Sequence, residues 1–386
     1  MTEKNYAIFS AQYPPHMGGV EVFTQSLARE LSARGNHVTV VANDTEGVGA
    51  GKTDEDGVEV FRMPCWPLMN GRMPLHKHGS ATRALRRELF SRKWDGVLVN
   101  TRFYLHSLLG MKLAMNSGLV PVLLDHGSAH LSVTSPVVDA AIHCYEHAIT
   151  AYGKLQYAPT YYGISKMSST WLEHFSITSS GEINNSIDAD AYVGRASSRD
   201  FRAELGLGNR FVIAFTGRLI PEKGVDAIIE ASSNPRLQER EVVFLLAGDG
   251  PLMPKAKDAE GDHLHALGRL DSTDVASLLL QSDALCLPTR SEGFSTTLLE
   301  AAACGCPAIV TDVGGARELI PTDEFGTIIP DMSADSIAEA VATLADDRTL
   351  LEQQRVNCAR WVRETCSWSA TADALEKAWG TADLRH

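Results

Sequence analysis

The stretch RSEGFSTTLLEAAACGCPAIVTD, residues 290–312, decides the fold. It predicts a turn at Gly293, a helix with Ser295 as its N-cap, and then a short apolar strand, PAIVTD. The apolar run DALCLPT precedes it, so strand, helix and strand follow one another, as in a parallel sheet covered by helices. Glu292 falls in the turn, and Glu300 lies about five residues into the helix, roughly 7 Å along its axis. Two carboxylates therefore follow the same strand, one in the turn before the helix and one farther along the helix.

The same alternation continues on both sides of this stretch. Five strands are expected in the first half of the chain, at YAIFSAQ, HVTVVAND, VEVFRMP, DGVLVNT and PVLLDHGS. The second half adds FVIAFTGR, EVVFLLAGDG, HLHALGR and GTIIP to the two strands above, and the polar stretch 188–210 fits a linker with one short helix. Since 386 residues exceed what one core normally organises, we expect an α/β protein with two Rossmann-like, doubly wound parallel-sheet domains.

The composition excludes several classes of protein. A formal net charge of −13 argues against a nucleic-acid partner, because such proteins neutralise phosphates with basic residues. The first residues lack the apolar run of a secretory signal, and no stretch approaches the roughly 20 apolar residues that span a bilayer.

Seven cysteines without a C-x-x-C pair indicate buried thiols in a reducing compartment, so a cytoplasmic location is expected. Cys304 and Cys306 have no histidine nearby, and no metal site is expected there.

Ligands of doubly wound sheets bind at the carboxyl ends of the strands, so the residues that follow each strand are candidates. No G-x-G-x-x-G follows either first strand, which removes the main support for a dinucleotide oxidoreductase. Gly18 and Gly19 precede a helix whose free amides could meet an anion; a plain glycine turn is the alternative. Arg218 and Lys223 could hold a diphosphate together, unless they are two solvated surface cations.

Glu292 and Glu300 suit a ligand with two groups of hydroxyls. One carboxylate would meet a polyol at the mouth of the helix and the other a second polyol farther along, with phosphate on the free amides between them. The alternative is a capped, partly buried helix that carries two unrelated acids. Candidate features at several successive strand ends favour the ligand site.

These segments together resemble the family 4 retaining glycosyltransferases of the GT-B fold. The resemblance rests on the E-x7-E pair of Glu292 and Glu300, on GRLIPEKG and LLAGDGPL, on the block 265–320, and on PPHMGGVE near the N-terminus. It covers nearly all of 211–318, and in the first half it depends mainly on PPHMGGVE, DHGS and NNSID. It implies two domains facing a central cleft. Residues 1–188 would bind the acceptor, with a last helix at about 368–386 packing back on them, and residues 189–367 would bind the donor.

The resemblance also implies a role for each candidate residue. The Gly19 amide, beside Gly18, would meet the donor diphosphate, and Arg218 and Lys223 would stabilise the charge that grows on it. Glu292 would hold hydroxyls of the donor sugar, Glu300 those of the ribose, and His126 would lie near the reaction centre. The implied catalytic residues are Glu292, His126, Arg218 and Lys223, and the implied donor-binding residues are Gly18, Gly19, Gly293, Phe294, Ser295, Glu300, Gly268, Arg269 and Leu270.

The function that the resemblance implies is retaining, metal-independent transfer of a hexose-type sugar without a cofactor. The donor would be a UDP- or GDP-sugar, and the acceptor a hydroxyl of a glycan or lipid-linked molecule in cell-envelope or exopolysaccharide biosynthesis. Glu292 is not expected to act as a covalent nucleophile. Two alternatives remain: an enzyme of the same architecture that acts on sugar nucleotides without an acceptor, such as an epimerase or phosphorylase-like protein, and a catalytically inactive sugar-nucleotide-binding scaffold.

The chain departs from the family pattern at two places. Ser186 stands where many members have glycine at the interdomain hinge, so a backbone conformation that prefers glycine would be filled by serine. The segment VNTRFYLHS lacks a family signature, which leaves Arg102 and His106 as possible acceptor contacts beside a plain solvated surface.

A basic segment stands out in the acidic chain. Residues 62–93 hold eight basic residues and one acidic residue, Glu88, and include the apolar Trp66 and Leu68. Basic residues interleaved with apolar ones suit an anionic membrane surface, on which the protein would be peripheral at the inner face of the cell membrane. A solvated helix beside a packed loop is the alternative.

Overall fold

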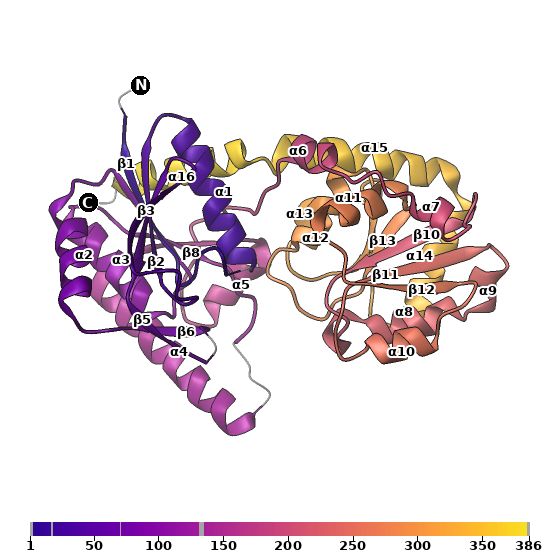
Figure 1. The fold of residues 1–386 in the computed structure, drawn as a ribbon, viewed down its shortest axis with the longest axis horizontal. Coiled ribbons are helices and arrows are strands. Elements are labelled where there is room, and N and C mark those ends of the chain that lie inside the picture. Colours follow the sequence, from indigo (N-terminus) through magenta and orange to yellow (C-terminus); the bar gives the residue numbers. More distant parts are fainter. Residues whose placement is uncertain (1–2, 17, 70, 131–134, 384–386) are drawn as a thin grey trace. The chain divides into compact units, whose positions relative to one another are not determined.

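The computed structural model describes residues 3–16, 18–69, 71–130 and 135–383. The chain folds as two compact units. Unit 1 comprises Met1–Asn185 and Trp368–His386, and unit 2 comprises Ser186–Ser367. Each unit is a sheet covered by helices (Figure 1). The chain therefore passes between the units twice, after Asn185 and after Ser367. The boundaries expected from the sequence follow residues 188 and 367.

Unit 1 is built on a seven-stranded sheet in the order β3-β4-β2-β1-β7-β8-β9. Only β3 runs antiparallel, against β4. The strands are β1 (Asn5–Phe9), β2 (His37–Asn43), β3 (Gly51–Glu55), β4 (Val58–Met63), β7 (Gly96–Asn100), β8 (Val122–Asp125) and β9 (Thr160–Gly163), and a separate hairpin pairs β5 (Cys65–Leu68) with β6 (Met73–His76). Ile8 in β1 aligns with Val40 of β2 and Leu98 of β7, which places β1 at the centre.

Helices cover both faces of this sheet. Helices α1 and α16 pack on each other and on one face, and α3 packs against β1 and β7. The helices of unit 1 are α1 (Gly19–Ala33), α2 (Ser80–Ser91), α3 (Leu105–Asn116), α4 (Pro136–Tyr157), α5 (Lys166–Glu173) and α16 (Trp368–Asp383). Apolar β-branched and aromatic side chains fill the strands because both faces are covered; Phe9, Val99 and Leu123 belong to the resulting core.

Unit 2 is built on a six-stranded, fully parallel sheet in the order β12-β11-β10-β13-β14-β15. The strands are β10 (Phe211–Thr216), β11 (Val242–Ala247), β12 (Leu264–Gly268), β13 (Ala284–Leu287), β14 (Ala308–Thr311) and β15 (Thr327–Ile329). All six were expected from the sequence, and each ends one to three residues before the expected strand does. This is the doubly wound fold that the alternation of strands and helices predicts.

The helices of unit 2 lie on both sides of its sheet, with α8 and α10 on one side and α11, α12 and α15 on the other (Figure 1). They are α6 (Ala189–Gly194), α7 (Phe201–Glu204), the 3₁₀ turn η1 (Pro221–Lys223), α8 (Val225–Ser232), α9 (Pro235–Gln238), α10 (Met253–Asp258), α11 (Ser272–Gln281), α12 (Thr296–Ala303), α13 (Ala316–Leu319), α14 (Ala334–Asp346) and α15 (Arg348–Thr365).

The structure corrects several local expectations. Strands β3, β5, β6 and β9 were not expected from the sequence, and the stretch 188–210 forms two short helices rather than one. Ser186 is not among the residues with a left-handed backbone, and its hydroxyl donates to the carbonyl of Ser367 at 3.1 Å. The serine therefore fills no conformation that favours glycine. Among the described residues, no helix is long and apolar enough to cross a membrane.

Candidate functional site

The strand order of unit 2 reverses at β10, which pairs with β11 on one side and β13 on the other. At such a switch point the loops after the two diverging strands leave a crevice at the carboxyl ends. The segments 217–224 and 288–295 follow β10 and β13. They contain Arg218, Lys223, Glu292 and the start of α12, so the fold brings these candidates to one edge of one sheet.

Backbone contacts fix these loops against each other. The amide of Arg290 donates to the carbonyl of Glu222 at 2.8 Å, and the Thr289 hydroxyl donates to the same oxygen at 3.2 Å. Gly224 has a φ of 70°, and a Cβ there would overlap the carbonyl of Pro288. Only glycine fits this position, because it combines a left-handed backbone with no space for a side chain.

Lys223 and Glu292 form an ion pair across the two loops. Both side chains are partly exposed, at 19% and 24%. Arg218 is exposed, and among the described residues its guanidinium has no carboxylate partner. The sequence predicts each of these groups but not their pairing. Glu292, which was expected to bind sugar hydroxyls, is ion-paired with Lys223, which was expected to bind phosphate.

Helix α12 begins beside this ion pair. Ser295 is the N-cap with an extended backbone, as expected, but its side chain makes no capping hydrogen bond. The first amides of the helix are thus left for another acceptor. Phe294 is buried and packs on Gly315, where a Cβ would come within 2.5 Å of the ring. The aromatic side chain, which follows Gly293, therefore holds this loop against the start of α13.

Glu300 lies one turn into α12, a helix that packs on α6. Burial raises the pKa of its carboxyl to about 7, against which the charge of Arg195 acts weakly. The hydroxyl of Tyr192 is buried without a hydrogen-bond partner among the described residues. Burial and then the Glu300 charge raise the pKa of that phenol. A ligand hydroxyl between the two groups would satisfy both, which fits the role expected for Glu300.

Residues 268–270 follow β12 at the same edge. Gly268 has a φ of 74°, and its carbonyl accepts from the amide of Gly248 at 2.8 Å. Arg269 is exposed and Leu270 partly so. The segment thus adjoins the loop after β11, and its role in donor binding stays a prediction.

In unit 1, His126 follows β8 and is held by a relay of hydrogen bonds. Thr24 donates to the carbonyl of Val20 at 2.7 Å, so its oxygen accepts from the amide nitrogen of Asn100 at 3.0 Å. The Asn100 oxygen then accepts from Nε2 of His126 at 2.9 Å. Burial lowers the pKa of His126 to about 3. The ring is therefore neutral, with its proton on Nε2 and a lone pair on Nδ1.

Gly18 and Gly19 begin α1, as expected. Nothing lies within 4 Å of a Cβ built on Gly19, whereas one on Gly18 would overlap the carboxylate of Glu21. Burial raises the pKa of Glu21, whose carboxylate lies 3.5 Å from Nδ1 of His16. Glu21 was not predicted as a site residue, although the dipole of a helix favours an acid in its first turn.

Arg102 and His106 are not acceptor contacts, and neither lies on a solvated surface. The Arg102 side chain is 1% exposed, is ion-paired with Asp125, and lies 3.9 Å from the ring centroid of Phe175. Nε2 of His106 donates to the carbonyl of Val41 at 2.8 Å, its Nδ1 accepts from Nε2 of His76 at 3.0 Å, and burial lowers its pKa to about 3. Both residues are structural, because they are buried and bonded to other groups of unit 1.

The basic segment is less charged at the surface than its composition suggests. Arg62 is buried and paired with Glu55, and Arg92 is paired with Glu59 and Glu88. The exposed basic residues are Arg72, Lys77, Arg83, Arg87 and Lys93. The β5–β6 hairpin beside them exposes Trp66, Leu68, Met69 and Leu75.

The sequence matches two family models, one in each half. Residues 197–361 match the model "Glycosyl transferases group 1", and residues 17–177 match "Glycosyltransferase Family 4". The candidates of unit 2 lie within the first match, and Gly18, Gly19 and His126 lie within the second.

Named relatives carry related descriptions. The chain is 31% identical over 193 residues to an α-D-kanosaminyltransferase of Streptomyces kanamyceticus, and this match spans about half of each chain, 49%. It is 24% identical to a D-inositol 3-phosphate glycosyltransferase of Kribbella flavida, over 95% of this chain and 91% of the relative.

Solved structures are similar over the whole chain. Sucrose-phosphate synthase of Thermosynechococcus elongatus has a TM-score of 0.71 at 18% identity, covering 100% of both chains. The Anabaena protein HepE in complex with UDP has a TM-score of 0.72 at 16% identity, covering 98% of this chain and 100% of that one. At these identities the likeness shows the fold, and it confirms the expected GT-B architecture of two Rossmann-like domains.

Proposed function

Because the chain belongs to the group 1, family 4 glycosyltransferases, we propose that it transfers a hexose-type sugar from a UDP- or GDP-sugar to a hydroxyl of a glycan or lipid-linked acceptor. The transfer retains the anomeric configuration and uses no metal or other cofactor. The acceptor belongs to cell-envelope or exopolysaccharide biosynthesis. The observation that supports the proposal is the packing of the loops after β10 and β13, with the Lys223–Glu292 ion pair between them, the uncapped start of α12 after the second loop and Arg218 in the first.

The donor diphosphate would replace one side of the Lys223–Glu292 ion pair. In the unliganded protein Glu292 neutralises Lys223; a diphosphate is a stronger acceptor for the ammonium group and releases the carboxylate for sugar hydroxyls. Arg218, which has no carboxylate partner in the described structure, adds a second cation. Glu300 and Tyr192 would meet the ribose hydroxyls, and residues 268–270 the base.

The chemistry then depends on charge stabilisation. As the bond between the anomeric carbon and the phosphate oxygen breaks, negative charge grows on the diphosphate, where two cations and helix amides stabilise it. The acceptor hydroxyl attacks from the face that the diphosphate leaves, so the configuration is retained, and its proton passes to the departing phosphate oxygen. Neutral His126 offers the Nδ1 lone pair to a hydroxyl of the donor sugar.

Thermal unfolding in the presence of nucleotides tests the donor. HepE is described in complex with UDP, and a similar mannosyltransferase of Mycobacterium tuberculosis is described as GDP-mannose-dependent, so both bases are candidates. A ligand at 100 times its dissociation constant stabilises a protein by about 2.7 kcal/mol. We expect UDP or GDP, but not both equally, to raise the melting temperature. No shift with any nucleoside diphosphate would contradict the proposal.

Turnover separates transfer from the two alternatives. We expect release of the nucleoside diphosphate to need an acceptor alcohol and to be abolished in Glu292→Ala, which should still bind nucleotide. Rapid turnover without any acceptor would indicate an enzyme of the epimerase or phosphorylase class. Tight nucleotide binding without turnover in the presence of varied acceptors would indicate an inactive scaffold.

The surface of residues 66–93 supports an acceptor at an anionic membrane. Trp66 and Leu68 are 45% and 51% exposed on the β5–β6 hairpin, next in sequence to the basic helix α2. We expect the protein to sediment with anionic liposomes at low salt and a Trp66→Ser/Leu68→Ser variant to remain in solution. Leu155→Ser, at a residue that is 85% exposed on α4, is the matched control. Equal sedimentation of all three proteins would remove the hairpin from the membrane contact.

A further inference from the structure

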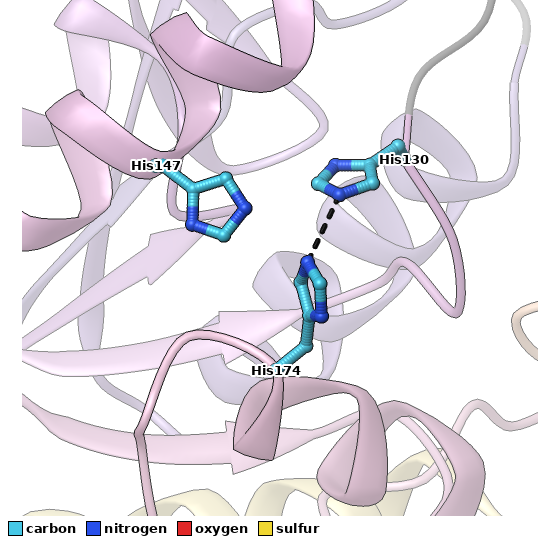
Figure 2. A group of neighbouring side chains, drawn as sticks. All are labelled: His130, His147 and His174. Atoms are coloured by element: carbon cyan, nitrogen blue, oxygen red, sulfur yellow. Dashed lines mark hydrogen bonds between the residues drawn. The ribbon is translucent and has the colours of Figure 1, made fainter.

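Three histidines from separate segments of unit 1 meet at its surface (Figure 2). His130 lies in the segment after β8, His147 on α4, and His174 at the C-cap of α5. One ring nitrogen of each lies within 4.8 Å of the others. We propose that these imidazoles bind one divalent transition-metal ion of the zinc class. None of the three histidines has a role in the proposed transfer.

The spacing of the nitrogens suits a tetrahedral ion. Zinc–nitrogen bonds of about 2.0–2.1 Å place two tetrahedral ligands about 3.3 Å apart. Nε2 of His130 and Nε2 of His174 are 3.1 Å apart (Figure 2). His147 is exposed, so its ring can turn the remaining distance towards a common centre. Without an ion, His130 and His174 are joined by a hydrogen bond.

A buried carboxylate orients the least exposed ligand. Nδ1 of His130 lies 2.8 Å from Oε2 of Glu146, whose side chain is 1% exposed and is also held by Arg102 at 3.3 Å. A carboxylate on Nδ1 keeps the proton there and leaves the lone pair on Nε2, which faces His174. Histidines that bind metals usually have such a partner on their other nitrogen.

Neighbouring aromatic rings restrict the side chains of His174 and His130. His174 is stacked on Trp171 with ring centroids 4.8 Å apart and an interplanar angle of 7°. His143, one turn before His147 on α4, is stacked on His130 at 4.0 Å. The loss of rotational freedom on binding an ion is therefore smaller than for three free surface histidines.

The ligand set selects the ion and its role. Imidazole nitrogens favour zinc, nickel or copper over magnesium and calcium, which prefer oxygen. The ion would join the segment that begins at His126 to α4 and α5, and three protein ligands leave a fourth position for water or another ligand. We therefore expect the ion to stabilise unit 1 locally.

Equilibrium dialysis of the EDTA-treated protein against zinc chloride tests the site. We expect one zinc ion per chain, a higher melting temperature with zinc but not with magnesium, and at least a tenfold loss of affinity in His147→Gln and in His174→Gln. Both residues are exposed, so the variants should unfold at the wild-type temperature without metal.

Two exposed residues provide controls. Cys144→Ser removes the exposed thiol of α4, and His37→Gln removes an exposed histidine elsewhere in unit 1. Both should keep the wild-type affinity. Unchanged zinc binding in the His147 and His174 variants, loss of binding in Cys144→Ser, or no zinc bound to the wild type would overturn the proposal.

Discussion

Glu300 combines a buried carboxyl with a proposed role at the nucleotide. Its pKa of about 7 lies above the ordinary value of 4.5, so between these values the folded protein holds a proton that the unfolded chain releases. Stability therefore falls as pH rises from about 4.5 to 7 and is constant above that range. We expect Glu300→Gln, measured by urea unfolding, to stabilise the protein at pH 8 by up to about 3 kcal/mol and to have little effect at pH 4.5.

The same substitution should weaken nucleotide binding at pH 8, because a neutral amide is a poorer acceptor for ribose hydroxyls than a carboxylate. Binding to the wild type should strengthen as pH rises through 7, and binding to Glu300→Gln should not follow this course. A Gln variant with an unchanged pH dependence of affinity would place the ribose elsewhere. Calorimetric titration with the selected diphosphate measures both.

Lys223 should matter more for the transition state than for binding. The Lys223→Met variant leaves the charge on the diphosphate less stabilised, and losing one such group typically costs about 10² to 10³ in kcat. We expect that loss in steady-state transfer assays, with a smaller change in KM and partial recovery in Lys223→Arg. Lys257→Met, at an exposed residue of α10, should leave kcat unchanged. An equal loss in both methionine variants would show a non-specific effect of charge.

Single residues were predictable where local sequence determines their position. Arg218, Lys223, Glu292 and Glu300 follow particular strands, so their place at one sheet edge could be predicted from the order of elements. The burial of Arg102 could not, because it depends on Asp125 and Phe175, which other segments supply. The three histidines of the proposed metal site likewise come from separate segments and share no local pattern. The one local signal is the spacing of His143 and His147 on α4, and only His147 of these two is a proposed ligand.

At the scale of elements, the loops after β10 and β11 pack backbone to backbone. Gly248 has a φ of 148°, and a Cβ there would overlap the carbonyl of Gly217. We expect Gly248→Ala to destabilise the protein by at least about 2 kcal/mol in urea unfolding, because the side chain meets both strain and a clash. The displaced 217–224 loop should also weaken donor binding.

Gly261 provides the control for that substitution. It lies in the same unit, has no left-handed backbone and has open space around its Cβ position. Gly261→Ala should change stability by no more than about 0.5 kcal/mol. If the two alanine variants were equally stable, the packing of the two loops would not be rigid.

The predicted elements are those with strong apolar patterns. Strands β10, β11, β13 and β14 of unit 2 are fully buried, so their apolar composition identifies them. Strand β3 was missed because GKTDE is polar and mostly exposed at an antiparallel edge. The hairpin strands CWPL and MPLH each contain proline, which normally argues against a strand, and β9, TYYG, lacks the aliphatic run of the strands that were predicted.

At the scale of the whole molecule, α16 completes unit 1. Trp379 is 5% exposed and is stacked on Tyr6 with ring centroids 4.3 Å apart, and it fills the space that Gly96 leaves. Arg34, at the C-cap of α1, also forms ion pairs with Asp373 and Glu376 of α16. Since removing a buried tryptophan side chain costs about 3–5 kcal/mol, Trp379→Ala should speed hydrogen exchange in the strands of unit 1 and leave β10–β15 unchanged.

Trp361→Ala is the counterpart in unit 2. Its indole donates to the carbonyl of Glu318 at 2.8 Å and lies edge-on to Phe325. This variant should raise exchange in unit 2 and spare unit 1. Equal exchange in both units for either variant would mean that the two units unfold as one.

The division of unit 1 into two segments has a consequence for biosynthesis. Trp368 and the residues after it leave the ribosome only when all of unit 2 has been made. Unit 2 therefore has its complete sequence first, while the earlier segment of unit 1 waits with the surface around Tyr6 uncovered. The part of the protein that is synthesised first is thus the last to finish folding, and during that interval it is the part most in need of a chaperone.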